Sequence, residues 1–87
     1  MTYYLEWSLM KRKNPKAICI YRTGEFYETY DEDAEKLSRD YGLSLISGPT
    51  NILDFPPIRE VVIPYHLIDG LVGNLLREKV NFCVINP

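Results

Sequence analysis

The chain has 87 residues, of which 46% are hydrophobic and 25% are charged. This is the composition of a soluble globular domain and argues against a disordered chain. The formal net charge of −2 argues against a strong freestanding duplex binder, since such proteins carry an excess of positive charge.

The first half of the chain begins with a predicted helix over residues 2–13, where Leu5 and Leu9 are spaced i,i+4 and define a buried stripe. Asn14-Pro15 ends the helix, because a residue before proline avoids the α region. Residues 16–22 are almost continuously apolar, which predicts a strand buried on both faces in the middle of a sheet.

A second strand over residues 26–30 is predicted to form a hairpin with the first, since Gly24 lies in the short connection. Side chains two apart in a strand share a face, so Phe26 and Glu28 project together and Tyr27 projects to the other side. An aromatic ring beside a hydrogen-bond acceptor is suited to meeting a nucleotide base, because the ring can wedge or stack and the carboxylate can test an edge.

Residues 31–41 form the second predicted helix, and Gly42 supplies its C-terminal stop. Its first turn is acidic, with Asp31, Glu32 and Asp33 in succession. These residues suit the positive end of the helix dipole, and we prefer this explanation to a metal site.

The second half of the chain continues the alternation of strands and helices. We expect strands at 43–47, 60–63 and 81–85, a proline-rich loop at 48–59, and a helix at 65–79. The helix has a one-sided apolar stripe made of Leu67, Ile68, Leu71, Val72, Leu75 and Leu76. The element order is αββαββαβ, which predicts an α/β fold with a mixed sheet of about five strands packed by three helices. We expect residues 1–87 to form a single domain, cytoplasmic and without a membrane span.

The residues with reactive side chains do not form a recognisable active site. Cys19 and Cys83 lie in apolar runs and are interpreted as free buried thiols rather than a disulfide. The sole histidine, His66, follows Pro64-Tyr65 and is expected to hold a turn. A carboxylate pair such as Asp54 with Glu60 is a weak signal for a hydrolase, so we expect no catalytic residue, metal or cofactor.

Positive side chains are the candidates for contacts to a nucleic-acid backbone. The cluster Lys11-Arg12-Lys13 is better explained as a solvated helix C-terminus than as a phosphate contact, because cations suit the dipole there. The candidates are Lys11, Arg12, Lys13, Lys16 and Arg22.

Taken together, the motifs resemble the N-terminal mismatch-recognition domain of the MutS DNA mismatch-repair family. The segment from Ile20 to Glu28 is similar to the family's apolar strand followed by Gly-Asp-Phe-Tyr-Glu. Asp33-Ala34, Leu43-Ser44-Leu45 and Ile63-Pro64-Tyr65-His66 match later family segments in order, and Val84 falls in a similar closing strand.

The resemblance implies roles for two residues. In the family the phenylalanine wedges beside a mispaired base and the glutamate hydrogen-bonds that base, so these roles fall on Phe26 and Glu28. The chain departs from the family at Ile46-Ser47-Gly48, where basic residues are usual, and at Val61-Val62-Ile63, where the family has Met-Ala-Gly.

The resemblance predicts a non-enzymatic module that binds mispaired or distorted DNA, weakly when isolated. The sequence has no phosphate-cradling Gly-x-x-x-x-Gly-Lys-Ser/Thr motif, so a separate protein would supply the ATPase and clamp functions. An alternative is a protein-interaction module that keeps the fold and has lost DNA binding, using exposed aromatic residues and the Phe55-Pro56-Pro57 loop.

Overall fold

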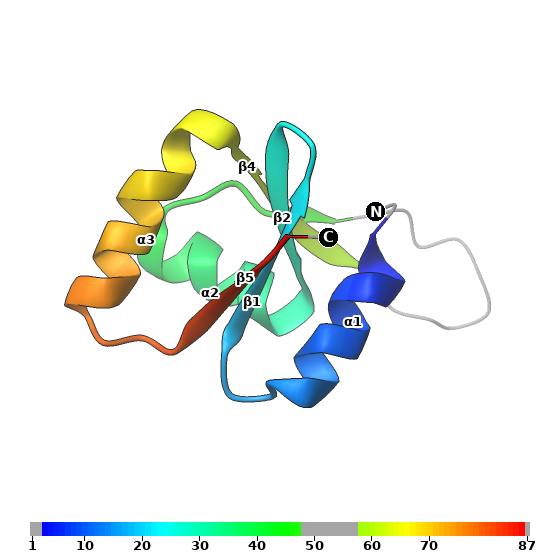
Figure 1. Ribbon diagram of the computed structural model, residues 1–87. Coiled ribbons are helices and arrows are strands. Elements are labelled where there is room, and N and C mark those ends of the chain that lie inside the picture. The colour runs from blue at the N-terminus through cyan, green and yellow to red at the C-terminus, as the bar shows by residue number, and fades with distance from the viewer. Residues whose placement is uncertain (1–2, 48–57, 87) are drawn as a thin grey trace.

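A computed structural model describes residues 3–47 and 58–86 as three layers, with a five-stranded sheet between helices (Figure 1). Helix α1 covers one face of the sheet, and α2 and α3 cover the other. The elements in chain order are α1 (Tyr4–Lys13), β1 (Ile18–Thr23), β2 (Phe26–Tyr30), α2 (Asp31–Tyr41), β3 (Ile46–Ser47), β4 (Arg59–Pro64), a 3₁₀ turn η1 (Tyr65–Leu67), α3 (Ile68–Arg77) and β5 (Phe82–Ile85). The order αββαββαβ and the mixed sheet are therefore confirmed.

The sheet has the strand order β3-β4-β2-β1-β5. Strand β2 pairs antiparallel with β1 and β4, and β4 pairs antiparallel with β3, whereas β5 runs parallel to β1. These directions make β2 parallel to β3 and β4 parallel to β5, so α2 and α3 each connect parallel strands that are not neighbours. Strand order is the part of the topology that the sequence pattern did not contain.

Strand β1 lies in the interior of the sheet and is buried on both faces, as its apolar run predicted. Ile18 and Ile20 pack beneath α2 and α3, whereas Cys19 and Tyr21 pack beneath α1. Strand β2 continues this alternation, since Tyr27 joins the first group and Tyr30 the second. Its side chains follow the period of two expected of a strand.

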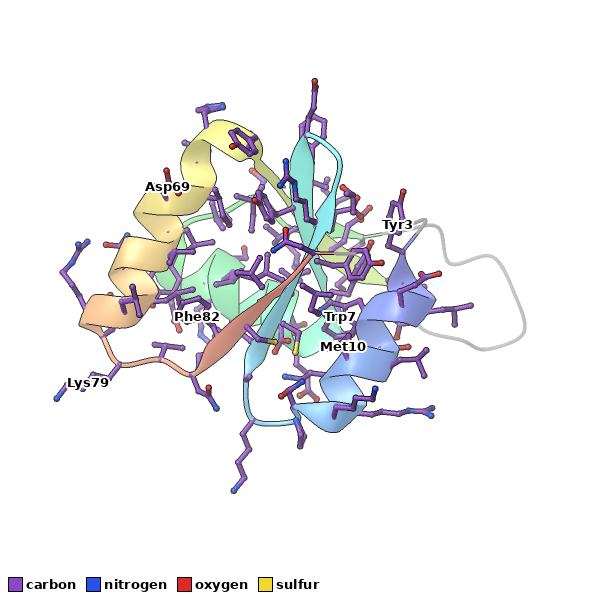
Figure 2. All side chains as sticks on the ribbon, viewed as in Figure 1. Tyr3, Trp7, Met10, Asp69, Lys79 and Phe82 are labelled. Atoms are coloured by element: carbon purple, nitrogen blue, oxygen red, sulfur yellow. The ribbon has the colours of Figure 1, made fainter. Side chains whose placement is uncertain are left out.

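The buried stripe predicted on the first helix is wrong. Leu5 and Leu9 are 73% and 56% exposed, and the buried residue of α1 is Trp7. Figure 2 shows Trp7 directed from α1 toward the sheet, where its indole Nε1 donates a hydrogen bond to the Cys19 carbonyl at 2.6 Å. The helix packs through one large aromatic side chain and its neighbours Tyr3 and Tyr4.

Two other boundaries differ from the sequence expectation. The strand predicted at 43–47 is reduced to Ile46–Ser47, and the helix predicted at 65–79 begins as the separate 3₁₀ turn η1. Of the predicted apolar stripe, Ile68, Leu71 and Leu75 are buried on α3, whereas Leu67 and Leu76 are 45% and 64% exposed, because the face that meets the sheet is narrower than the run of apolar residues. The predicted loop falls mainly outside the described residues. Among the described residues, no helix is long and apolar enough to cross a membrane.

Candidate nucleic-acid interface

The β1–β2 hairpin ends in a two-residue turn that presents Phe26. Thr23 and Phe26 are paired across the hairpin, and Gly24 between them has a φ of +77°. A positive φ at the first central position is the geometry of a type II′ hairpin turn, which glycine adopts without a steric penalty. The Phe26 side chain is 45% exposed and belongs to neither buried cluster. An aromatic ring at a hairpin tip is free to meet a flat partner.

Glu28 lies one row deeper on the same face of the sheet as Phe26. It is half-buried, and its register partners are Tyr21 on β1 and Val62 on β4. The Tyr30 hydroxyl donates a hydrogen bond to Glu28 Oε1. Burial, and then this hydrogen bond to a carboxylate, raise the pKa of the Tyr30 phenol, so it remains a proton donor at neutral pH. The Glu28 carboxylate is therefore held in a defined orientation.

The far side of the hairpin tip is fixed by Arg22 and two tyrosines, Tyr27 and Tyr65, whose rings stack on each other with their centres 6.4 Å apart. The Arg22 guanidinium carbon lies 5.9 Å from the centre of the Tyr27 ring and 5.4 Å from the centre of the Tyr65 ring. Both distances are in the range of cation–π interactions. Arg22 Nε also donates to the Gly24 carbonyl at 3.2 Å. One cation therefore connects the turn to β2 and to η1.

A backbone hydrogen bond adds a second connection between the hairpin and η1. The Tyr65 amide donates to the Glu25 carbonyl at 3.1 Å, which brings the Pro64-Tyr65-His66 segment against the tip. Together the two segments enclose an open hollow of about 600 Å³. Its lining combines aromatic, cationic and acidic side chains, namely Arg22, Gly24, Glu25, Phe26, Pro64, Tyr65 and His66.

Sequence reasoning did not place Tyr65 and His66 beside Phe26. They are distant in the chain, and their proximity follows from the pairing of β2 with β4, in which Phe26 is aligned with Pro64. His66 is exposed at the edge of the hollow. The sequence signal for this arrangement is that Tyr65 and His66 follow directly after the strand that ends at Pro64. That signal becomes informative only when β4 is known to lie next to β2.

Of the predicted backbone-contacting cations, the structure brings only Arg22 to the hairpin tip. Lys11 is internal: its Nζ donates to Asp33 Oδ1 at 2.8 Å and to the Ala17 carbonyl at 2.6 Å. The exposed side chains of Arg12, Lys13 and Lys16 lie where α1 leads into β1, at the opposite end of the sheet from the tip (Figure 1). Six residues of β1 separate the two ends, about 20 Å of extended chain.

The acidic first turn of α2 has structural partners. Asp33 is 5% exposed, and besides Lys11 it accepts the Cys19 amide on Oδ2 at 3.0 Å. Asp31 Oδ2 accepts the Tyr4 hydroxyl at 2.6 Å. The acids therefore join α2 to α1 and β1 rather than only capping their own helix. In the part of the chain that the structure describes, no three His, Cys, Asp or Glu side chains are grouped to hold a metal ion.

The carboxylate pair considered for a hydrolase is only half within the described residues. Asp54 lies outside them, and Glu60 is paired across the strands with Tyr30.

Comparison with known proteins gives a match to the family MutS domain I over residues 1–85. Similar proteins include the DNA mismatch repair protein MutS of Salinibacter ruber (strain DSM 13855 / M31), 32% identical over 75 residues and 86% of this chain. The proteins of the same name from Desulfatibacillum aliphaticivorans and Synechococcus sp. (strain JA-2-3B'a(2-13)) are each 36% identical, over 85% and 90% of this chain. The chain spans 8% of the length of these three relatives.

Proposed function

Because the chain belongs to the MutS domain I family, we propose that it is a non-enzymatic module that contacts mispaired or distorted DNA through the hairpin tip. Phe26 would enter the base stack at a weakened step, and Glu28 would accept a hydrogen bond from the displaced base. The observation that carries this proposal is the 45% exposure of Phe26 on a turn held by Arg22 and Tyr65.

The energetic basis of the selectivity is the cost of separating stacked bases. Inserting an apolar wedge costs a few kcal/mol per step in paired DNA, and a mismatch lowers that cost. The Phe26 ring then has only to fill the space between the separated bases. A tip that is already held in place by Arg22 and by the Tyr65 amide loses little conformational freedom on insertion.

The proposed affinity of the isolated domain is low. The net charge is −2, and the guanidinium of Arg22 already contacts the rings of Tyr27 and Tyr65. Phosphate neutralisation supplies most non-specific affinity, so a tip with few available cations depends on other domains to stay on DNA. The sequence has no phosphate-cradling motif, so ATPase and clamp functions would come from a separate protein or from chain beyond these 87 residues.

The test is a binding titration at low salt with two duplexes that differ by one mispaired base. The wild-type chain is expected to prefer the mismatched duplex by roughly threefold to tenfold, and Phe26→Ala is expected to abolish the preference. Leu9→Ala is the matched control, since Leu9 is 56% exposed on α1 and does not line the hollow at the tip. Equal affinity of the wild type for both duplexes, or an unchanged preference in Phe26→Ala, would contradict the proposal.

A protein-interaction module is the second candidate, and one observation favours it. Leu5 and Leu9 form an exposed apolar pair on the outer side of α1. The Phe55-Pro56-Pro57 loop, also expected to serve such a role, lies outside the described residues. A chain that shows no preference between the two duplexes, and whose hydrodynamic size grows when a MutS protein lacking its own domain I is added, would support this candidate over the first.

A further inference from the structure

Two cysteines that the DNA-binding proposal does not use face each other across neighbouring strands. Cys19 on β1 and Cys83 on β5 are aligned in the parallel register, and both thiols are reduced. Their sulfur atoms are 3.4 Å apart, with the Cys83 thiol directed at Cys19 Sγ. Aligned residues on neighbouring strands have Cα atoms about 4.8 Å apart, within the range of about 4.4–6.8 Å that disulfides span. Side-chain rotation is therefore enough to join the two sulfurs.

The two thiols differ in accessibility. Cys19 is 0% exposed beneath α1, and its Sγ lies 3.7 Å from the Ala17 carbonyl and 3.8 Å from the Asn14 carbonyl. Burial, and then the contact with Cys83, raise the pKa of the Cys19 thiol to about 12, which makes it a poor first nucleophile. Cys83 is half-buried on the edge strand.

Cys83 also opens onto a hollow that a small molecule can enter. This hollow has a volume of about 250 Å³ and lies beside the connection between α1 and β1. Lys16 and Asn81 are among its lining residues, so a cation and an amide stand near the thiol. A positive side chain in this hollow attracts an anionic reagent.

We propose that Cys83 is a site of thiol–disulfide exchange with small disulfides and that Cys19 is its resolving partner. The Cys83 thiolate attacks one sulfur of a disulfide RSSR, giving a Cys83–SR mixed disulfide and releasing RS⁻. Cys19 sulfur then attacks Cys83 Sγ and displaces the second RS⁻. The two thiol protons leave with the two RS⁻ groups, so the balance is one RSSR reduced to two RSH and one protein dithiol oxidised to a disulfide.

The product would fasten the edge strand to the sheet interior. Cys19 and Cys83 are 64 positions apart, so the bond closes a loop of most of the chain, and such loops constrain the unfolded state strongly. Among the described residues β5 pairs with β1 alone, which makes the β1–β5 pairing the one that oxidation strengthens. The hairpin tip lies beyond this pairing, so oxidation would stabilise the domain without altering Phe26.

The test exposes the reduced 87-residue chain to oxidised glutathione and follows the intact mass. The wild type is expected to lose two hydrogens and to gain no lasting glutathionyl group, and its melting temperature is expected to rise by roughly 5 °C or more. Cys19→Ala is expected to retain one glutathionyl group at Cys83. Cys83→Ser is the folding-safe variant, because Cys83 is only half-buried, and it is expected to remain unmodified.

Three outcomes would overturn the proposal. They are a wild type that stays reduced, a wild type that accumulates the stable mixed disulfide, and a Cys83→Ser variant that reacts as fast as the wild type. Circular dichroism of each variant identifies any loss of fold, and in that case the wild-type mass and melting temperature still decide the question.

Discussion

The contact between Lys11 and Asp33 is expected to be the most sensitive polar interaction of the fold. Asp33 is 5% exposed and accepts two hydrogen bonds, from Lys11 Nζ at 2.8 Å and from the Cys19 amide at 3.0 Å. The Asp33→Ala substitution removes both acceptors at once. It strands a partly buried ammonium beneath α1 and leaves an interior amide of β1 without its partner.

The magnitude follows from these two losses. An unsatisfied buried amide costs about 1–3 kcal/mol, and breaking a buried ion pair costs about 3–5 kcal/mol. Lys11 keeps 23% of its side chain exposed and retains the Ala17 carbonyl as an acceptor, which reduces the second cost. We expect Asp33→Ala to lower the free energy of unfolding by about 3 kcal/mol, a large fraction of the roughly 4–13 kcal/mol available to a domain of this size.

The assay is urea denaturation followed by the fluorescence of the single tryptophan, Trp7, which is buried and hydrogen-bonded to Cys19, the residue whose amide donates to Asp33. A double-mutant cycle with Lys11→Met separates the ion pair from the amide, and we expect a coupling energy of about 1–2 kcal/mol. An Asp33→Ala variant within 0.5 kcal/mol of the wild type, or a coupling energy near zero, would refute the reasoning. Lys11→Met is also expected to leave the salt dependence of DNA binding unchanged, because its ammonium is not available to phosphate.

Further expectations concern backbone conformation, an alkaline titration and the exposed helix face. Gly24→Ala is expected to lower the free energy of unfolding by about 1 kcal/mol because the φ of Gly24 is +77°, whereas Gly70→Ala on α3 is expected to raise it by up to about 1 kcal/mol. A Cβ added at either position meets no atom within 4 Å, so urea denaturation of the two variants separates the effect of backbone conformation from that of crowding. The hydrogen bond to Asp31 raises the pKa of Tyr4 from 10 to about 12, so its stabilising contribution is complete below pH 10 and is lost as the pH rises through 12. The free energy of unfolding of Tyr4→Phe should therefore fall less than that of the wild type between pH 9.5 and 11.5, and parallel decreases would contradict this assignment. Leu9→Ala is expected to change the free energy of unfolding by less than about 0.5 kcal/mol, since the side chain is 56% exposed, and a loss above 1 kcal/mol would show that the side chain is packed.

Local patterns in the sequence were sufficient for most elements. The apolar run of β1 predicted burial on both faces, and Gly24 and Gly42 both adopt the positive φ that their positions as turn and helix stop required. These signals depend on neighbours within a few residues, which is why a single sequence contains them.

The packing of α1 shows where local patterns fail. The i,i+4 leucines Leu5 and Leu9 gave a stripe, but the face that meets the sheet carries Trp7 and Lys11. Lys11 counts as a polar residue in any hydrophobicity pattern, and its burial depends on Asp33, which is 22 positions away. No local rule contains that partner, so the helix was predicted correctly and its orientation was not.

The candidate interface divides in the same way. The hairpin and the shared face of Phe26 and Glu28 follow from the period of a strand, whereas the approach of Tyr65 to Arg22 follows from strand order. Local geometry alone is enough to predict the hairpin and the shared face. The approach of Tyr65 to Arg22 depends on long-range strand pairing. Because the sequence contained two possible parallel crossovers, it did not determine which strands lie next to β2.

The proposed Phe26 wedge and the exposed cations lie at opposite ends of β1, and this separation predicts how DNA binding depends on salt. Phe26 lies at one end of the strand pair, and the exposed side chains of Arg12, Lys13 and Lys16 lie at the other. A tip inserted at a base step therefore leaves these cations about 20 Å away along the strand, beyond the screening length of about 8–10 Å at physiological salt. Raising the salt concentration should then weaken binding to matched and mismatched duplexes alike, while the ratio between them, set by the ring at the tip, stays constant. An affinity ratio between the two duplexes that falls as the salt concentration rises would show that charged contacts, rather than the Phe26 ring, discriminate between them.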